Sequence, residues 1–260
     1  MAINRTIWLP TLYPLPGWLC PRCQQGHLRL VDKSLSKRHT ASTRLNRDDP
    51  DWEPGCDRSV FAGILECDNA VCREVACISG VTSVIEVEED VGNGYPQQCF
   101  VDGYDVFFVR PAPLPFPLTF NVHKEVRDLV VKFSESYWAD PETAANKLRQ
   151  AIEVLLTDQK VPRTVINKHN KRQALSLHAR IEKYRKINPS VATLLLAIKW
   201  LGNEGSHPGS LIHKDVLDGY ELFEHIIDKV YNKTRSRLTG LANSINRNKG
   251  PVKPKRQRRK

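Results

Sequence analysis

Seven cysteines are the residues best able to do chemistry in this chain of 260 residues. Cys20 and Cys23 are separated by two residues, a glycine follows at Gly26, and a second pair, Cys67 and Cys72, lies much further along the chain. Two such pairs of thiolates, each held in a tight turn, can fill the four positions around one tetrahedral metal ion. The spacing therefore predicts a structural Zn²⁺ site whose ligands are Cys20, Cys23, Cys67 and Cys72.

Other uses of these cysteines fit the sequence less well. A redox Cys-x-x-Cys pair normally opens a helix after a strand, whereas Cys23 is followed by a glycine and a strand-prone run. An odd cysteine count and the lack of a secretion signal favour a metal over disulfides. The four-residue gap within the second pair is longer than usual. Cys77, Cys56 or His27 therefore remains an alternative to one of the four ligands.

The net charge of +10 is concentrated in two segments. Residues 247–260 hold eight Lys/Arg and no acidic residue, and residues 163–186 hold eight Lys/Arg and only Glu182. The rest of the chain has a net charge of −5. Concentrated positive charge is typical of polyanion binding, so we expect nucleic acid as a partner. The predicted contacts are Lys168, Lys171, Arg172, Lys253, Lys255, Arg256, Arg258, Arg259 and Lys260.

The same charge has a simpler explanation, in which the C-terminal run is a solvating tail and the internal run an exposed loop. No apolar run is long enough to cross a bilayer, since the longest, at 191–201, is well short of the roughly 20 residues required. The first ten residues lack the apolar stretch of a signal peptide. We therefore expect a cytoplasmic protein with no membrane partner.

The secondary structure expected to position these residues changes along the chain, from strands in the first half to helices in the second. Residues 1–112 hold short β-prone runs at 27–31, 60–66, 75–87 and 104–109, with a polar loop expected at 34–54. The proline-rich segment 113–121 is expected to be an extended linker. Residues 122–245 show helical periodicity, and 246–260 is expected to be a disordered basic tail. The fold class predicted is α+β, a small β-rich zinc-ribbon module followed by an antiparallel helical bundle.

Two helix starts have a physical basis, because Asp140-Pro141 and Asn188-Pro189 each combine a capping side chain with proline at the first helical position. The second of these helices is apolar almost all round, so it should be central in the bundle and end at Gly202.

Three segments, 145–156, 175–181 and 197–207, resemble a bacterial family of uncharacterised function whose helical domain belongs to the HEPN superfamily. A zinc ribbon with a tryptophan before its first cysteine, here Trp18, resembles the N-terminal part of one subgroup. The resemblance implies a HEPN-like bundle, a homodimer, and a place in defence or restriction-type systems with protein partners there.

Many HEPN proteins are metal-independent ribonucleases with an arginine, a polar residue and a histidine in their motif. The resemblance aligns Asn203 and His207 with the last two, whereas Gly202 stands in place of the arginine and Lys199 lies one turn earlier. The catalytic candidates are therefore His207, Asn203 and Lys199. The same residues also fit an ordinary helix C-terminus without catalytic function. In that alternative the Asn203 side chain closes the last turn, and His207 hydrogen-bonds to a neighbouring backbone group. The sequence thus favours a nucleic-acid-binding module, with an endoribonuclease that uses His207 as the alternative.

Overall fold

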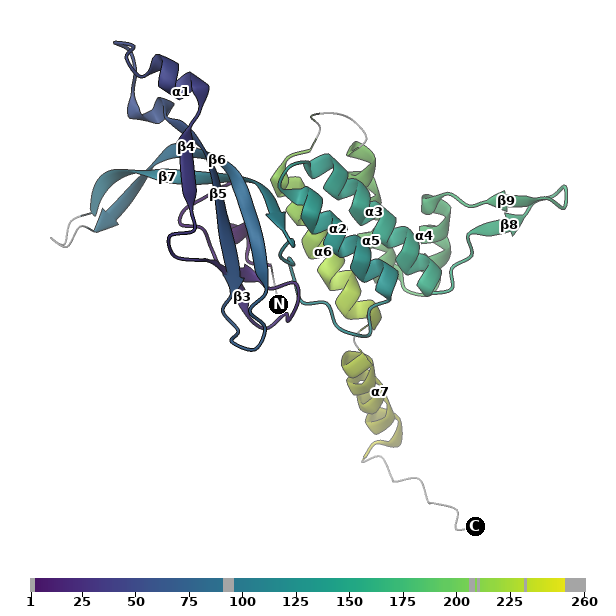
Figure 1. Cartoon of the computed structure of the whole chain (residues 1–260). Coiled ribbons are helices and arrows are strands. Elements are labelled where there is room, and N and C mark those ends of the chain that lie inside the picture. The colour runs from purple at the N-terminus through teal and green to yellow at the C-terminus, as the bar shows by residue number, and fades with distance from the viewer. Residues whose placement is uncertain (1–2, 91–95, 206–208, 210, 232, 251–260) are drawn as a thin grey trace.

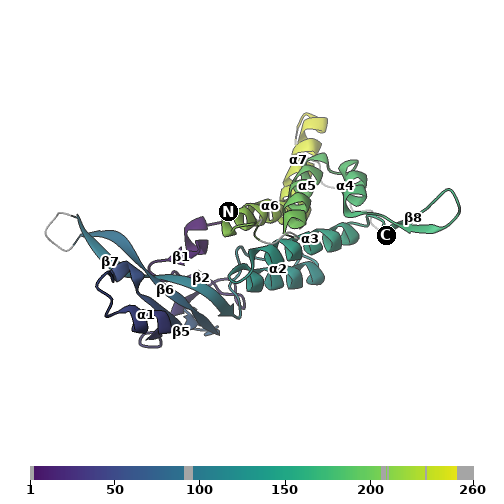
Figure 2. The ribbon, with the colours of Figure 1, turned by 90° about the horizontal axis from the view of Figure 1, so that it is seen from above.

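The computed structural model describes residues 3–90, 96–205, 209, 211–231 and 233–250, and its architecture is mixed α+β (Figure 1). The strands of the main sheet all come from the N-terminal half of the chain, and the longer helices come from the C-terminal half. Figure 2 shows the sheet and the helices as two neighbouring parts of one molecule. Among the helices described, none is long and apolar enough to cross a membrane.

Three long antiparallel strands form the centre of the sheet, β5 (Arg58–Cys67), β6 (Val75–Asp90) and β7 (Pro96–Arg110). The seven-stranded order is β1-β7-β6-β5-β3-β2, and β4 also pairs with β5. Side chains alternate along β5, so that Phe61 and Leu65 are buried while Val60 and Ile64 are exposed. The shorter strands are β1 (Thr11–Leu12), β2 (Trp18–Leu19), β3 (His27–Leu30) and β4 (Ser36–His39).

A β-bulge between β6 and β7 turns two consecutive phenylalanines to the outer face of the sheet. The register shifts at Ser79/Gly80, and Phe107 and Phe108 are both about half exposed, at 51% and 45%. Gly80 permits this close approach, because a Cβ there would lie 2.1 Å from the carbonyl oxygen of Asp105. The extra residue of a bulge explains why strict alternation fails at this point.

The expectation of an irregular loop at 34–54 is wrong. This segment contains β4, which pairs along β5, and the short helix α1 (Ala41–Asn46), followed by the 3₁₀ helix η2 (Pro54–Cys56). Thr40 caps α1 through its side chain, which accepts a hydrogen bond from the Thr43 amide. The strand is exposed on both faces, so it lacks the apolar alternation that would reveal it in the sequence.

An aromatic cluster joins the N-terminal segment and the sheet to the helices. Trp8 ends the 3₁₀ helix η1 (Arg5–Trp8), and its ring stacks on Trp138 with centroids 5.2 Å apart. Trp18 meets Trp138 edge-on, and its indole N–H donates to the carbonyl of Ile7 at 2.7 Å. The buried side chains of both halves therefore form one continuous core.

The proline-rich segment 113–121 has no helix or strand, as its composition requires, but it is not a free spacer. Leu114 and Phe116 are each 3% exposed and contribute to the shared core. The Leu114 amide donates to the carbonyl of Leu19, and the Leu118 amide donates to the side-chain oxygen of Gln24. The segment thus ties the helices to the turn that carries the first cysteine pair.

The C-terminal half contains six helices within the described residues. The two predicted helix starts are confirmed, since Asp140 accepts from the Thr143 amide at 2.8 Å and Asn188 accepts from the Val191 amide at 3.2 Å. Helix α5 packs against α3, α4 and α6, in the central position that its composition predicts. The helices are α2 (Lys124–Tyr137), α3 (Pro141–Asp158), α4 (Leu177–Arg185), α5 (Pro189–Glu204), α6 (His213–Tyr231) and α7 (Lys233–Asn248).

The prediction that Gly202 ends its helix is wrong. Helix α5 continues to Glu204, and Gly205 follows as its C-terminal cap. Gly202 is buried where α5 crosses α3, because a Cβ there would lie 2.6 Å from the Cβ of Arg149. The side-chain amide of Asn146 donates to the carbonyl of Gly205 at 2.8 Å and satisfies the end of the helix. The glycine permits close helix packing rather than a turn.

The sequence pattern does not delimit two further elements. The basic segment after α3 is a two-stranded hairpin, β8 (Thr164–Ile166) and β9 (Arg172–Ala174), rather than a loop. It projects from the helices in both views (Figures 1 and 2). Most of helix α7 lies within the segment expected to be helical; it extends away from the other helices and runs to Asn248, so its last three residues fall in the segment expected to be a disordered tail. Residues 251–260 lie outside the described part of the chain.

Candidate functional site

The first cysteine pair lies in a tight turn between β2 and β3. The Cys20 amide donates to the carbonyl of Gly26 at 2.9 Å, and the Gln24 amide donates to the carbonyl of Cys20 at 3.0 Å. Gln24 closes the turn in the left-handed conformation, with φ at 54°. No side chain fits at Gly26, since a Cβ there would lie 2.7 Å from the Sγ of Cys67. Glycine is therefore required where the two turns meet.

The second cysteine pair lies in the turn that joins β5 to β6. The Cys67 amide donates to the carbonyl of Glu74 at 2.8 Å, and the Cys72 amide donates to the carbonyl of Asn69 at 2.9 Å. Arg73 completes this turn with a positive φ of 49°. These bonds bring Cys67 and Cys72 to one side of the turn despite the four residues between them.

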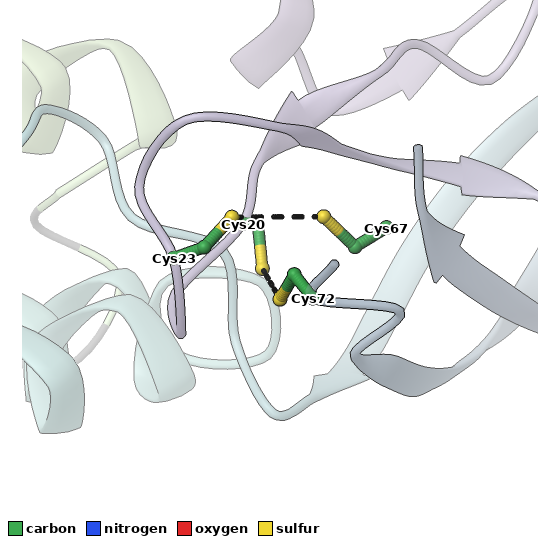
Figure 3. Close-up of side chains that lie close together, drawn as sticks. All are labelled: Cys20, Cys23, Cys67 and Cys72. Atoms are coloured by element: carbon green, nitrogen blue, oxygen red, sulfur yellow. Dashed lines mark hydrogen bonds between the residues drawn. The ribbon is translucent and has the colours of Figure 1, made fainter. Parts of the chain in front are cut away.

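Antiparallel pairing of β3 with β5 brings the two turns together, with Leu28 opposite Cys67. Figure 3 shows the four cysteine side chains pointing toward one another. Their four Sγ atoms all lie within 4.8 Å of one another; Cys20 and Cys72 are 3.8 Å apart, and Cys23 and Cys67 are 3.7 Å apart. These distances are too long for disulfides and compatible with a metal site.

The sulfur–sulfur distances also fit the size of a thiolate-bound ion. A tetrahedral ion with metal–sulfur bonds of about 2.3 Å places its sulfurs about 3.8 Å apart. Both short sulfur–sulfur distances in the cluster are close to that value. Two of the four cysteines are buried and two are partly buried, so protein encloses the centre. A shell filled by four protein ligands is typical of a structural rather than a catalytic metal.

The thiols of the cluster differ in acidity because their surroundings differ. The Gly26 amide donates to the Sγ of Cys23 at 3.3 Å and lowers the pKa of that thiol to about 6. Burial raises the pKa of Cys67 to about 12, and burial also raises the pKa of Cys20. A divalent metal bound at this cluster would hold all four cysteines as thiolates, since a thiol that coordinates a metal is deprotonated.

The three alternative ligands lie outside this cluster. Cys56 and Cys77 are exposed and are not among the four clustered sulfurs. His27 instead interacts with Asp68: its amide donates to Asp68 at 2.7 Å, and its Nδ1 lies 4.0 Å from that carboxylate. Arg29 also donates to Asp68 at 2.9 Å, so this carboxylate ties β3 to the second cysteine turn. The hydrogen bond from the His27 amide contributes most to lowering the pKa of Asp68 below its usual value, and the hydrogen bond from Arg29 adds to it.

The internal basic residues lie on the β8–β9 hairpin. Lys168, Lys171 and Arg172 are all exposed. Residues 159–181 contain six Lys/Arg and no acidic residue. A second basic segment runs through α7, since residues 233–260 contain eleven Lys/Arg and no acidic residue. The predicted contacts in the tail, Lys253, Lys255, Arg256, Arg258, Arg259 and Lys260, lie outside the described residues.

The structure describes two of the three catalytic candidates. Asn203 lies in the last turn of α5 and is half-buried. The ammonium of Lys199 lies 3.3 Å from the centroid of the Trp200 ring, in a cation–π contact. His207 lies outside the described residues. The sequence did not indicate that Arg149 packs against Gly202, because the two residues come from different helices.

Two segments of the chain match models of protein families. Residues 11–109 match a domain of unknown function (DUF8608), and residues 132–248 match another domain of unknown function (DUF4145). Neither the comparison with curated proteins nor that with solved structures found a match. The first matched segment contains the four clustered cysteines, and the second contains the basic hairpin and helix α7. The chain is therefore similar to two domains of unknown function over separate segments, one holding the candidate metal centre and the other the basic elements.

Proposed function

We propose that this chain is a zinc-containing nucleic-acid-binding protein. Its zinc is structural, held by the thiolates of Cys20, Cys23, Cys67 and Cys72, and its helices form a HEPN-like scaffold that presents the basic elements. The observation that carries the proposal is the hairpin itself, an exposed element on which positive charge occurs without a single acidic residue. Phosphate backbones are the common biological polyanion that such an element attracts.

The location of the charge supports binding rather than mere solubility. A solvating surface mixes both signs and spreads them over the molecule. On the sheet several basic residues are paired with acidic ones: Lys37 pairs with Asp102, and Arg73 pairs with Glu66. The hairpin has no acidic residue of its own to offset its charge. Its cations are therefore concentrated where a polyanion can reach them.

The accessory or sensor role that we propose follows from the resemblance of the helical part to the HEPN superfamily. In that role the chain recognises nucleic acid for a defence or restriction-type system, acts in the cytoplasm, and pairs with a second copy of itself. The arginine expected in the nuclease motif is replaced by Gly202, whose place in a helix crossing leaves no room for a side chain. This packing favours binding over cleavage.

One observation favours the alternative, a metal-independent endoribonuclease. Arg149 of α3 lies directly against Gly202 through its Cβ and Cδ, so an arginine side chain starts beside the position where the motif carries its own arginine. Its side chain is 36% exposed and lies 3.6 Å from Glu153. In such an enzyme His207 would move the proton of the 2′-hydroxyl while Arg149 steadied the phosphate.

Binding to labelled tRNA and to single- and double-stranded DNA tests the proposal. The zinc-loaded chain is compared with the variant K168A/K171A/R172A and with the control K33A/R44A/R47A, which removes three exposed basic residues elsewhere. We expect the hairpin variant alone to weaken binding, and the slope of log Kd against log salt to fall by roughly 0.9 for each phosphate that the variant no longer neutralises. Equal binding by all three proteins would contradict the assignment of the hairpin.

Incubation of the same RNA in EDTA separates the two functions. Cleavage that H207A and R149A both abolish would establish the ribonuclease and overturn the binding-module proposal. Binding without cleavage, unchanged in H207A, is the result that we expect.

A further inference from the structure

The β8–β9 hairpin is an ordered ribbon that buries nothing against its own protein. Thr164 pairs with Ala174, and Ile166 pairs with Arg172. The pairing extends at both ends, where the Asn167 amide donates to Lys171 at 2.9 Å and the Leu175 amide donates to Arg163 at 2.8 Å. No residue from 162 to 174 is buried. Because an isolated two-stranded ribbon is only marginally stable in water, a ribbon of this kind is suited to gaining its packing from a ligand.

Side-chain hydrogen bonds fix the shape of the ribbon tip. The carboxamide oxygen of Asn167 accepts from the His169 amide at 2.9 Å and from the Lys171 amide at 3.0 Å. Asn170 occupies the left-handed region with φ at 58°, which asparagine tolerates better than most residues. The tip therefore presents Lys168 and Lys171 from a defined turn rather than from a mobile loop.

One face of the ribbon combines a guanidinium with exposed apolar groups. Residues directly opposite each other in an antiparallel pair point to the same face, so Ile166 and Arg172 lie side by side there. Thr164 and Ala174 share this face one pair further along. Ile166 is 71% exposed, although isoleucine is among the residues most often buried. Binding to phosphate alone does not explain an exposed isoleucine on this face.

We propose that this ribbon enters the major groove of B-form duplex DNA and reads base edges with the face that carries Ile166 and Arg172. Arg172 donates both its terminal N–H groups to the O6 and N7 acceptors of a guanine, and Ile166 contacts a thymine methyl. Lys168 and Lys171 at the tip contact phosphates and set the register. This inference rests on the proposed function and names its substrate class.

The dimensions of the ribbon fit that groove. The extended chain advances four residues from Arg163 to Asn167, and at about 3.3 Å per residue this stem is roughly 13 Å long, more than the groove depth of about 8.5 Å. Its strands are about 4.8 Å apart, so a groove about 12 Å wide accepts both with their side chains. The major groove of A-form RNA is deep and too narrow for side chains to read. The fit thus selects duplex DNA over duplex RNA.

Fluorescence anisotropy with the full zinc-loaded chain tests the substrate class. The probes are a mixed-sequence 24-base-pair DNA duplex, the RNA duplex of the same sequence, and one DNA strand alone. We expect the DNA duplex to bind at least about tenfold more tightly than either other probe at equal salt, because only it offers a readable major groove. Equal affinity for the three probes would overturn the groove proposal while leaving nucleic-acid binding intact.

Two conservative variants test which side chains read bases. R172K keeps the charge but loses the paired donors of the guanidinium, and I166A removes only apolar surface. Both variants should weaken binding to the DNA duplex at least about fivefold without changing the dependence of log Kd on log salt. The R172K variant should also no longer protect guanine N7 of the bound DNA from methylation by dimethyl sulfate. Because the ribbon buries nothing, metal content and unfolding midpoint should match wild type in both.

The outcomes separate this inference from the proposed function. The ribbon would contact phosphates only if the wild-type protein bound DNA without protecting guanine N7. The same conclusion would follow if R172K and I166A bound DNA with the affinity of the wild type. Failure to bind any of the three probes would sink both the inference and the proposed function.

Discussion

Gly202 of α5 lies so close to Arg149 of α3 that a methyl group on the glycine would come within 2.6 Å of the arginine Cβ. The two helices approach one another at this residue and again at Gly205, where a Cβ would lie 2.8 Å from the carbonyl oxygen of Glu142. The resemblance to HEPN nucleases leads one to expect an arginine at position 202. That position is instead occupied by the glycine that the crossing of α3 and α5 requires. Packing between α3 and α5 therefore requires glycine at this position.

Substituting Gly202 with alanine should therefore destabilise the fold. Overpacking a tight core contact costs about 1–3 kcal/mol, so G202A should lower the free energy of unfolding by that amount in urea denaturation. The matched control is G240A in α7, where a Cβ meets nothing within 4 Å and alanine suits a helix better than glycine. G240A should be at least as stable as wild type. A G202A protein as stable as wild type would mean that the crossing is looser than the structure shows.

The proposed zinc site should be essential for the stability of the end of the sheet where the two cysteine turns meet. C67S removes one of four sulfurs, and we expect bound zinc, measured by mass spectrometry of the purified protein, to fall from one ion per chain to none. The decrease in stability should be large, since structural zinc sites contribute on the order of 10 kcal/mol. C56S, which alters an exposed cysteine outside the cluster, should retain the metal. Full zinc occupancy in C67S would show that another side chain serves as a ligand.

Arg180 is a buried cation whose removal should cost much of the stability of the helical part. It is 4% exposed and donates to the carbonyls of Glu153 and Val161 and to the hydroxyl of Thr157, at the C-terminal end of α3. R180M removes these three hydrogen bonds from a charged donor and should cost about 3 kcal/mol.

The matched control is Arg185 on the same helix, which forms an i,i+3 ion pair with Glu182. R185M should leave the thermal midpoint close to wild type, because exposed ion pairs contribute little. Equal effects of the two substitutions would contradict a special role for the buried guanidinium.

Stability should also depend on pH through His213. Its ring meets Tyr137 edge-on at 5.0 Å, and burial lowers its pKa below the ordinary value of about 6.5. The unfolded chain then takes up the proton more readily than the folded one. The stabilisation is therefore fully present above about pH 6.5 and is lost as the pH falls through the lowered folded pKa.

Urea unfolding at about pH 7.5 and pH 5.5 measures this effect. H213Q should lose less stability than wild type between the two conditions, whereas H225Q, which alters an exposed histidine, should follow wild type. Acid weakening of the metal site is common to all three proteins and cancels in the comparison. A wild-type pH dependence in H213Q would refute the role of His213.

Much of the site could be predicted from local sequence alone. Cys20, Cys23 and Gly26 form a turn whose hydrogen bonds join residues close in the chain, so spacing indicates it directly. The same holds for the caps at Asp140 and Asn188, because a side chain bonds an amide three residues later. Local geometry also explains why four residues between Cys67 and Cys72 still allow the two sulfurs to meet, because hydrogen bonds within the turn bring both cysteines to one side of it.

Elements without an apolar pattern escaped prediction. Strands β4 and β9 are exposed on both faces, and β8 has no buried residue, so no buried alternation marks these strands. Residues 240–248 of helix α7 are exposed or half-buried, so no buried stripe marks that part of the helix. These are also the elements that a binding partner can reach, so the segments least visible in the sequence include the best candidates for function.

The sequence by itself determined the four cysteines that cluster, the helix starts, the α+β class and the concentration of charge, because each depends on residue type and short spacing. Only the tertiary structure decided that β3 and β5 bring the two cysteine turns together and that Gly202 belongs to a helix crossing. It also decided that Ile166 and Arg172 share a ribbon face. These relationships join residues through strand register and helix packing, which depend on contacts across the whole chain and leave no local signal.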